Sequence, residues 1–287
     1  MARVAITGGG GQLGRQLDAT FRAAGDVVWA LTHEDVDIGH PATLEALVEW
    51  KPDIVINAAA WTDVDGCARD PGRAMAINGE GAGAVAAAAA RAGASVVQVS
   101  TNEVFDGRRD EPYAEDDPPN PINAYGASKL AGERAAAAAN PRHVIVRTAW
   151  LFGPGGTNFV TKIVAAAERA AASGSPMRIV DDEWGNPTWT PDLARAIAGL
   201  ATDEHGPHIV HAVGMPPATR MDWARVALEA AGVEVEVEPV ALASFERAST
   251  PPERAILRPT AGVPQMDWRS VTLRYAPTTR AQPTTAS

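Results

Sequence analysis

Short apolar runs alternate with longer, helix-like segments along the first half of the chain. The runs are continuously apolar, which is typical of strands covered by helices on both faces. The predicted strands are Arg3–Thr7, Val27–Leu31, Asp53–Ile56, Ser95–Val99 and His143–Arg147. The predicted helices are Gln12–Ala24, Pro41–Trp50, Pro71–Arg91 and Ala124–Ala139. This alternation predicts an α/β fold with a doubly wound parallel sheet.

After about Trp150, predicted strands and helices no longer alternate regularly. The pattern predicts helices over Asn158–Ser173, Pro191–Ala201 and Arg220–Ala231, a strand over Ile209–Ala212, and irregular Pro-rich stretches over Gly214–Ala218 and Thr250–Pro264. We expect one domain from residues 1–150 together with late elements at about 185–212. Residues 151–184 and 213–275 are expected to form a smaller C-terminal α/β domain, followed by a polar, mobile tail at 276–287.

Composition limits the kinds of molecule that the protein is expected to bind. The net charge is −10 and the sequence contains no basic patch, so neither nucleic acid nor an anionic membrane is expected as a partner. No apolar run approaches the roughly 20 residues of a membrane span, and a strand begins at Arg3 where a signal peptide would need an apolar stretch. The single cysteine, Cys67, excludes an internal disulfide. These features lead us to expect a cytoplasmic protein.

A glycine-rich loop follows the first predicted strand and opens the first helix. In VAITGGGGQLG, Gly8, Gly11 and Gly14 are spaced G-x-x-G-x-x-G, and Gly9, Gly11 and Gly14 also fit G-x-G-x-x-G. Such glycines let the chain turn tightly and approach a pyrophosphate at the N-terminus of the helix. The context is the one that a dinucleotide site requires, although a glycine-rich turn without a ligand is the alternative.

The end of the second strand bears on the choice of cofactor. A carboxylate there would bond the adenine ribose of NAD and repel a 2′-phosphate. Thr32 and His33 occupy this position, which favours NADPH. NADH remains open because Asp35 and Asp37 are close in sequence. Asp37 and Ile38 are alternatively placed to cover the adenine.

Tyr125 and Lys129 form a Y-x-x-x-K pair within NAYGASKLAGE. Residues at i and i+4 share one face of a helix. A neighbouring cation favours phenolate and should lower the tyrosine pKa from about 10, so the pair is suited to proton transfer near neutral pH. An exposed helix face is the alternative interpretation.

Polar residues also end the fourth predicted strand, in VVQVSTNEVFDG. Ser100, Thr101, Asn102 and Glu103 follow directly on an apolar run. Unpaired polar groups are costly to bury, so these side chains are expected to face a ligand or one another.

Together these motifs resemble a known family over nearly the full length of the chain. The segments that carry the resemblance are GGGGQLG, PDIVINAAAWTDVDGCARDP, AINGEG, STNEVFDG, PYAEDDPPNPINAYGASKLAGE, RTAWLFGPGGTNFV, GNPTWTPDLA and TPPERAILRP. They are similar to those of the dTDP-4-dehydrorhamnose reductase family, within the extended short-chain dehydrogenases/reductases. The resemblance implies a Rossmann-like sheet domain and a smaller C-terminal substrate domain for the sugar nucleotide.

The resemblance also implies an activity: NADPH (or NADH) gives hydride to the C4 ketone of a dTDP-4-keto-6-deoxy sugar. It implies that Tyr125 protonates the developing alkoxide, that Thr101 bonds the same oxygen, and that Lys129 holds the cofactor ribose. The residues implied to hold the cofactor, with those expected near the adenine, are Gly8, Gly11, Gln12, Leu13, Gly14, Asp37, Ile38, Ala58, Ala59, Ala60, Ser100, Tyr125 and Lys129. Those implied to contact the substrate are Thr62, Thr101, Asn102, Glu103, Tyr125, Trp150, Asn158, Trp184 and Arg258.

Departures from the family pattern leave alternatives open. Asn102 and Glu103 replace the usual Asp-Tyr, which puts the sugar preference in question. Either Arg254 or Arg258 matches the arginine of a late motif, and Arg258 fits somewhat better. Some relatives form magnesium-bridged dimers through acidic residues, but Gln16 stands at that place, so we predict no metal and a monomer or a homodimer. A nucleotide-sugar 4,6-dehydratase or epimerase, and a non-catalytic regulatory subunit like that of methionine adenosyltransferase, are the rival functions.

Overall fold

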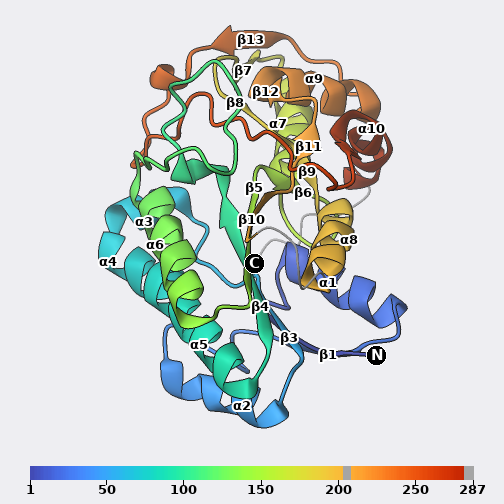
Figure 1. The fold of residues 1–287 in the computed structure, drawn as a ribbon. Coiled ribbons are helices and arrows are strands. Elements are labelled where there is room, and N and C mark those ends of the chain that lie inside the picture. Colours follow the sequence, from blue (N-terminus) through green and yellow to red (C-terminus); the bar gives the residue numbers. More distant parts are fainter. Residues whose placement is uncertain (203–207, 281–287) are drawn as a thin grey trace.

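The computed structural model describes residues 1–202 and 208–280. Its centre is a six-stranded, all-parallel sheet with the strand order β10-β5-β4-β3-β1-β2 (Figure 1). The strands are β1 (Arg3–Thr7), β2 (Val27–Leu31), β3 (Ile54–Asn57), β4 (Ser95–Thr101), β5 (His143–Thr148) and β10 (Ile209–His211). The order reverses direction at β1, as in a doubly wound sheet, so the predicted Rossmann-like α/β class is confirmed.

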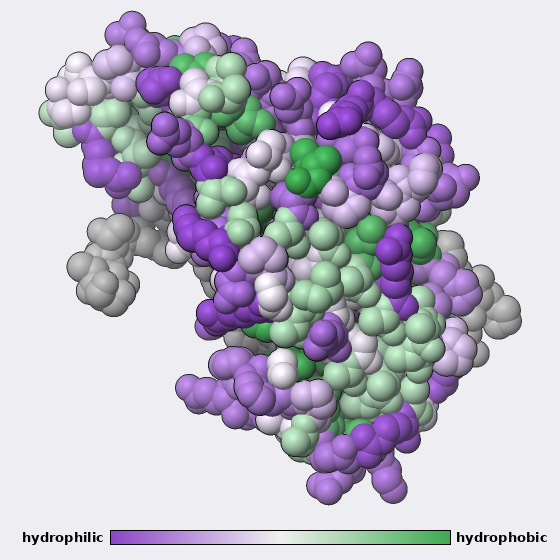
Figure 2. All heavy atoms as spheres, turned by 90° about the vertical axis from the view of Figure 1, so that its left-hand side faces the viewer, coloured by the Kyte–Doolittle hydropathy of each residue, from purple (hydrophilic) through white to green (hydrophobic). Residues whose placement is uncertain are grey.

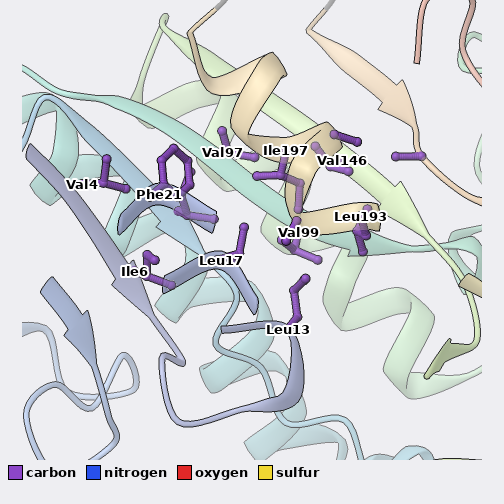
Figure 3. Packing of buried hydrophobic residues seen from close by; sticks show 14 of the residues in the cluster. Val4, Ile6, Leu13, Leu17, Phe21, Val97, Val99, Val146, Leu193 and Ile197 are labelled. Carbon is purple, nitrogen blue, oxygen red and sulfur yellow. The ribbon is translucent and has the colours of Figure 1, made fainter. Parts of the chain in front are cut away.

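Helices cover both faces of the sheet. One face is packed by α1 (Gln12–Ala23) and α8 (Thr190–Ala201), whose apolar side chains form one cluster with those of the strands (Figure 3). The opposite face is packed by α2 (Glu45–Trp50), α5 (Ala82–Ala92) and α6 (Ala124–Ala139). Alanines dominate α5 and α6, and their small side chains leave a broad, pale surface over these helices (Figure 2).

The C-terminal part has its own apolar cluster. It is built around Trp223, Trp268 and Phe152, all fully buried. The helices are α7 (Phe159–Ser173), α9 (Arg220–Ala231) and α10 (Trp268–Thr279). Capping boxes begin two of them: Asn158 with Thr161 at α7, and Thr219 with Asp222 at α9.

Short strands complete this part in pairs. The parallel pairs are β7 (Met177–Val180) with β13 (Val237–Val240), β6 (Leu151–Phe152) with β9 (Thr188–Trp189), and β11 (Gly214–Met215) with β14 (Met266–Asp267). The pair of β8 (Trp184–Gly185) with β12 (Ala218–Thr219) is antiparallel. Single 3₁₀ turns are η1 (Pro41–Leu44), η3 (Asn102–Val104) and η4 (Leu242–Ser244).

The predicted long helix Pro71–Arg91 is continuous in the structure, to Ala92, but it contains a π-helical segment. It consists of α4 (Pro71–Ala74), a π-helical segment η2 (Met75–Gly81) and α5, and a further helix, α3 (Val64–Arg69), precedes it. The π-helical segment carries Asn78, whose amide bonds both backbone groups of Trp61. Most residues of Pro71–Arg91 are Ala or Gly, so its hydrophobic pattern is too weak to show the shift that a π-helical insertion produces.

The boundary of the predicted mobile tail was wrong. Helix α10 continues to Thr279, and Ala276 is fully buried in it, because its apolar face packs against α9. Residues 281–287 of that tail lie outside the described residues.

An ion pair is buried where α6 meets β5. Arg147 donates to both carboxylate oxygens of Glu133, at 2.9 and 2.8 Å, and the two side chains are 1% and 6% exposed. Ser100 of β4 donates a third bond to Glu133 at 2.5 Å. The pair therefore joins one helix to two neighbouring strands.

We predict that Arg147→Met lowers the free energy of unfolding by about 3–5 kcal/mol, because it leaves the Glu133 carboxylate buried without its partner. Urea denaturation measures the change. Arg91→Met is the matched control, since the Arg91–Glu45 pair is also bidentate but more than half exposed, and its loss should be much smaller. Equal losses in the two variants would contradict the assigned role of the buried pair.

Candidate active site

A cavity of about 480 Å³ opens at the carboxyl ends of β1, β3, β4 and β5. Ligands bind at this edge in open α/β sheets. The sequence-predicted residues that line it are Gly8, Gly11, Gln12, Leu13, Gly14, Ala58, Ala60, Thr62, Ser100, Thr101, Asn102, Glu103, Tyr125, Lys129 and Trp150. The cavity therefore joins the glycine loop to the Tyr125–Lys129 pair.

The glycine loop contributes backbone atoms to one wall of the cavity. A Cβ on Gly14 would lie 2.1 Å from the carbonyl oxygen of Gly8, and a Cβ on Gly8, whose φ is +73°, would lie 2.7 Å from the amide nitrogen of Ala59. No side chain caps the first turn of α1 at Gly11, so its free N–H groups are available to an anion. This cradle fits the pyrophosphate of a dinucleotide.

Helix α6 presents Tyr125 and Lys129 to the cavity. Asn123 caps its first turn by accepting a bond from the Gly126 N–H at 2.8 Å. Lys129 Nζ donates to the carbonyl oxygen of Val99 in β4 at 2.7 Å, and its side chain is buried. Burial lowers the pKa of Lys129 to about 8, although the charge of Glu133 opposes the shift.

The prediction that Lys129 lowers the pKa of Tyr125 was wrong. The pKa of Tyr125 lies above its ordinary value, chiefly because burial disfavours the phenolate and because the charge of Glu103 is close. A hydrogen bond with Thr101 opposes this shift, and the charge of Lys129 is not among its main causes. Tyr125 is accordingly a protonated phenol at neutral pH, ready to donate a proton.

Asn102 and Glu103, which follow β4, make different contacts. Asn102 is buried, and its amide donates to the carbonyl oxygen of Ala255 at 2.9 Å, which ties down the Pro-rich C-terminal stretch. Glu103 accepts a bond from the Asn123 amide at 2.7 Å and lines the cavity. Burial and the charge of Glu183 raise the pKa of Glu103.

Trp150 closes the far side of the cavity. Its backbone φ is +44°, and its ring packs in parallel on Trp223 at a centroid distance of 6.0 Å. The guanidinium of Arg220 lies 3.6 Å from the ring centroid. The same Arg220 lines a second hollow of about 280 Å³, together with Phe159, Ile163, Arg178, Glu183, Phe245 and Arg247.

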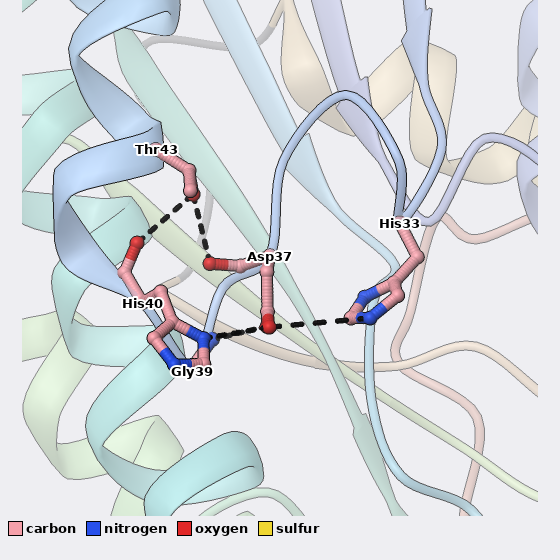
Figure 4. Close-up of polar contacts among 5 residues, drawn as sticks. All are labelled: His33, Asp37, Gly39, His40 and Thr43. Atoms are coloured by element: carbon pink, nitrogen blue, oxygen red, sulfur yellow. Dashed lines mark hydrogen bonds and ion pairs between the residues drawn. The ribbon is translucent and has the colours of Figure 1, made fainter.

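The structure places other predicted residues away from the cavity. Asp37 turns into its own loop, where its carboxylate bonds the Gly39 N–H at 2.9 Å and His40 Nδ1 at 2.7 Å and lies 3.9 Å from His33 Nε2 (Figure 4). The side chain of Ile38 is buried in the core beneath this loop. Ala59 contributes only backbone against Gly8.

The predicted substrate residues of the C-terminal part are also engaged elsewhere. Asn158 is buried and bonds Gly153 and Tyr275 as the cap of α7. Arg258 has an exposed side chain and does not line the cavity, while its own backbone N–H donates to the Tyr113 carbonyl and its carbonyl oxygen contacts His211 Nδ1. Trp184 pairs with the Arg254 segment, and the Arg254 guanidinium lies 4.9 Å from its ring centroid.

Sequence reasoning missed several residues that the fold brings to the two hollows. Arg220 and Arg247 are the most informative, because they supply positive charge beside Trp150 and Glu103. Nothing in their sequence neighbourhood distinguishes them from solvent-exposed arginines. Additional lining residues of the main cavity are Val64, Val99, Thr148, Ala149, Leu151 and Thr157.

The described residues contain neither a metal-binding cluster nor a helix that could span a membrane. No group of three or more His, Cys, Asp or Glu side chains in this part of the chain is arranged to hold a metal ion. His205 lies outside the described residues. None of the described helices is long and apolar enough to cross a membrane.

Comparison with known proteins gives consistent matches. The family described as RmlD substrate binding domain matches residues 2–276. A dTDP-4-dehydrorhamnose reductase of Mycolicibacterium smegmatis is 39% identical over 275 residues, which are 93% of this chain and 83% of that protein.

Solved structures agree with the sequence match. The crystal structure of a dTDP-4-dehydrorhamnose reductase from Clostridium acetobutylicum is similar at a TM-score of 0.91 and 34% identity, covering 97% of this chain and 99% of that one. A Bacillus anthracis dTDP-4-dehydrorhamnose reductase in complex with NADP is similar at a TM-score of 0.88 and 33% identity, covering 95% and 97% of the two chains.

We predict that Lys129 titrates near pH 8 in the folded protein, more than two pH units below an ordinary lysine. The only lysines in the sequence are Lys51, Lys129 and Lys162, so carbon NMR of lysine-labelled protein can follow each one, with Lys129→Arg for assignment. Glu133→Gln should lower the Lys129 pKa further, because the attracting carboxylate is lost. An ordinary lysine pKa at this position would contradict the burial argument.

Proposed function

Because the chain belongs to the RmlD substrate binding domain family, we propose that it reduces the C4 ketone of a dTDP-4-keto-6-deoxy sugar with NADPH (or NADH). The observation that carries the proposal is the single cavity that joins the glycine loop to Thr101, Tyr125 and Lys129. The dTDP-4-dehydrorhamnose reductases that this chain resembles support the reaction class.

The dinucleotide, when bound, supplies the hydride. The loop from Gly8 to Gly14 holds the pyrophosphate with backbone N–H groups, and Lys129 holds the adjoining ribose. Tyr125 donates its proton to the oxygen that becomes an alkoxide as the ketone is reduced, and Thr101 bonds the same oxygen. Two donors fixed where charge develops stabilise that charge without reorganising, and the elevated pKa of Tyr125 keeps its proton available at neutral pH.

The sugar nucleotide is assigned to the C-terminal part, residues 151–184 and 213–275. Trp150 offers its ring to the sugar, since an indole covers a sugar face with apolar area. Arg220 and Arg247, which line the adjoining hollow, offer positive charge to the diphosphate. Of the two candidate arginines of the late motif, Arg254 beside Trp184 is better placed than the exposed Arg258.

NADPH is the favoured cofactor, with NADH kept as the alternative. The NADP found in the relative from Bacillus anthracis supports NADPH. Asp35, however, accepts bonds from both the N–H and the hydroxyl of Thr32 at 2.8 Å, which brings a carboxylate to the end of β2. A cytoplasmic location and a monomeric or homodimeric state belong to the same proposal.

The rival functions are less well supported. In a 4,6-dehydratase, the residue at Asn102 would have to donate a proton to the leaving hydroxyl, and its amide instead binds the carbonyl of Ala255. A non-catalytic regulatory subunit would not need Tyr125 and Lys129 together in one cavity, yet both line it.

We predict that Tyr125→Phe lowers kcat by about 10²–10⁴-fold, the usual worth of a general acid. NADPH binding should change little, because the phenylalanine keeps the ring. The loss of NADPH absorbance with a panel of dTDP-4-keto-6-deoxy sugars measures turnover, and quenching of protein fluorescence measures binding.

Product formation without net consumption of NADPH in the wild-type enzyme would refute the reductase assignment. Near-normal turnover in Tyr125→Phe would refute only the role of the phenol. Trp29→Phe is a matched control for changing an aromatic residue, because Trp29 is half-buried against Trp50 of α2 and does not line the cavity.

A further inference from the structure

Glu103 is a carboxyl group inside the reducing cavity that the ketone reduction does not use. It lines the same cavity as Thr101 and Tyr125. The Asn123 amide holds its Oε2 at 2.7 Å, and the oxygen of the same Asn123 side chain caps α6 at Gly126. The carboxyl is thus fixed to the start of the helix that carries Tyr125, and its charge acts directly on the phenol.

None of the basic side chains in the described residues forms an ion pair with this carboxyl. Among residues 1–202 and 208–280, no basic side chain lies within 4.0 Å of Glu103. The two arginines whose charges act on Glu103 are already paired, Arg220 with Glu183 at 2.9 Å and Arg247 with Asp65 at 3.5 Å. A half-buried carboxyl that is held by an amide and has no ion-pair partner has a raised pKa, which strengthens it as a proton acceptor.

A substrate ketone has neighbouring C–H bonds that such a base can deprotonate. A C–H bond next to a carbonyl is acidic because the electron pair left on carbon delocalises onto the oxygen as an enolate. The hydroxyls of Thr101 and Tyr125, which serve the alkoxide in the proposed reduction, would stabilise an enolate oxygen at the same place.

We propose that Glu103 is a general base toward a carbon adjacent to the substrate ketone, so that the enzyme also exchanges that carbon-bound hydrogen with solvent. The carboxylate takes the proton as the C–H bond breaks, and the electron pair forms a C=C bond while the carbonyl π electrons move to oxygen. Reversal returns a solvent-derived proton from Glu103 to the same carbon. No oxidation or reduction occurs, and the step rests on the proposed substrate class, a 4-keto sugar.

The test is deuterium incorporation in D₂O. The enzyme is incubated with NADP⁺, which cannot donate a hydride, and dTDP-4-keto-6-deoxyglucose, and the recovered sugar is examined by mass spectrometry and proton NMR. Deuterium should enter a carbon next to C4 at least about ten-fold faster than without enzyme, a lower bound for general base catalysis. Exchange in Glu103→Gln should fall to the rate without enzyme, while reduction in a parallel NADPH assay falls by a smaller factor.

Three results would overturn the proposal: exchange no faster than without enzyme, label at a carbon not adjacent to C4, or undiminished exchange in Glu103→Gln. If Glu103→Gln does not fold, as judged by thermal unfolding and NADP⁺ binding, Glu103→Asp replaces it, and its shorter reach should slow exchange more than reduction. The NADPH assay separates the two hypotheses. A wild-type enzyme that fails to reduce the sugar refutes the proposed function, whereas one that reduces it without exchange refutes only the role of Glu103.

Discussion

Polar bonds from helix α6 to the ends of β4 and β5 are the constraint on which the site depends. Lys129 donates a hydrogen bond to the Val99 carbonyl. Glu133, one turn further along the helix, accepts hydrogen bonds from Arg147 and Ser100. A helix held only by alanines could slide on the sheet, since small apolar contacts fix no register. Directional bonds between buried charged groups fix the position of Tyr125 relative to Thr101. The same bonds place the Lys129 charge in a dry setting, which lowers its pKa.

The opposite wall of the cavity depends on glycines, which have no side chain. At Gly8 and Gly14 a single added carbon would collide with neighbouring backbone, so the loop approaches β3 closely and leaves its N–H groups facing the cavity. One wall therefore offers neutral donors for a pyrophosphate, and the other offers a protonated phenol beside a cation. Glu103 is the exception, because it is a carboxyl without a direct ion-pair partner among the described residues, in a site otherwise built to receive negative charge.

Local patterns predicted the parts of the molecule that depend on neighbours in sequence. The five apolar strands, the loop from Gly8 to Gly14 and the Tyr125–Lys129 pair could all be predicted, since each has its own period or spacing. The π-helical segment around Asn78 could not, because Pro71–Arg91, composed mostly of Ala and Gly, has too weak a hydrophobic pattern to show an inserted residue. Neither could the position of Arg220 beside Trp150, since tertiary packing joins segments 70 residues apart. The pKa of Tyr125 was mispredicted because the spacing to Lys129 does not report burial.

The central claim is that this one cavity delivers hydride directly from the dinucleotide to C4 of a sugar nucleotide. Its most direct test uses NADPH deuterated at the transferable position of the nicotinamide ring, with a dTDP-4-keto-6-deoxy sugar as acceptor. NMR of the product should show deuterium on C4, with one label per cofactor oxidised. A product that carries no deuterium at C4 would contradict the account.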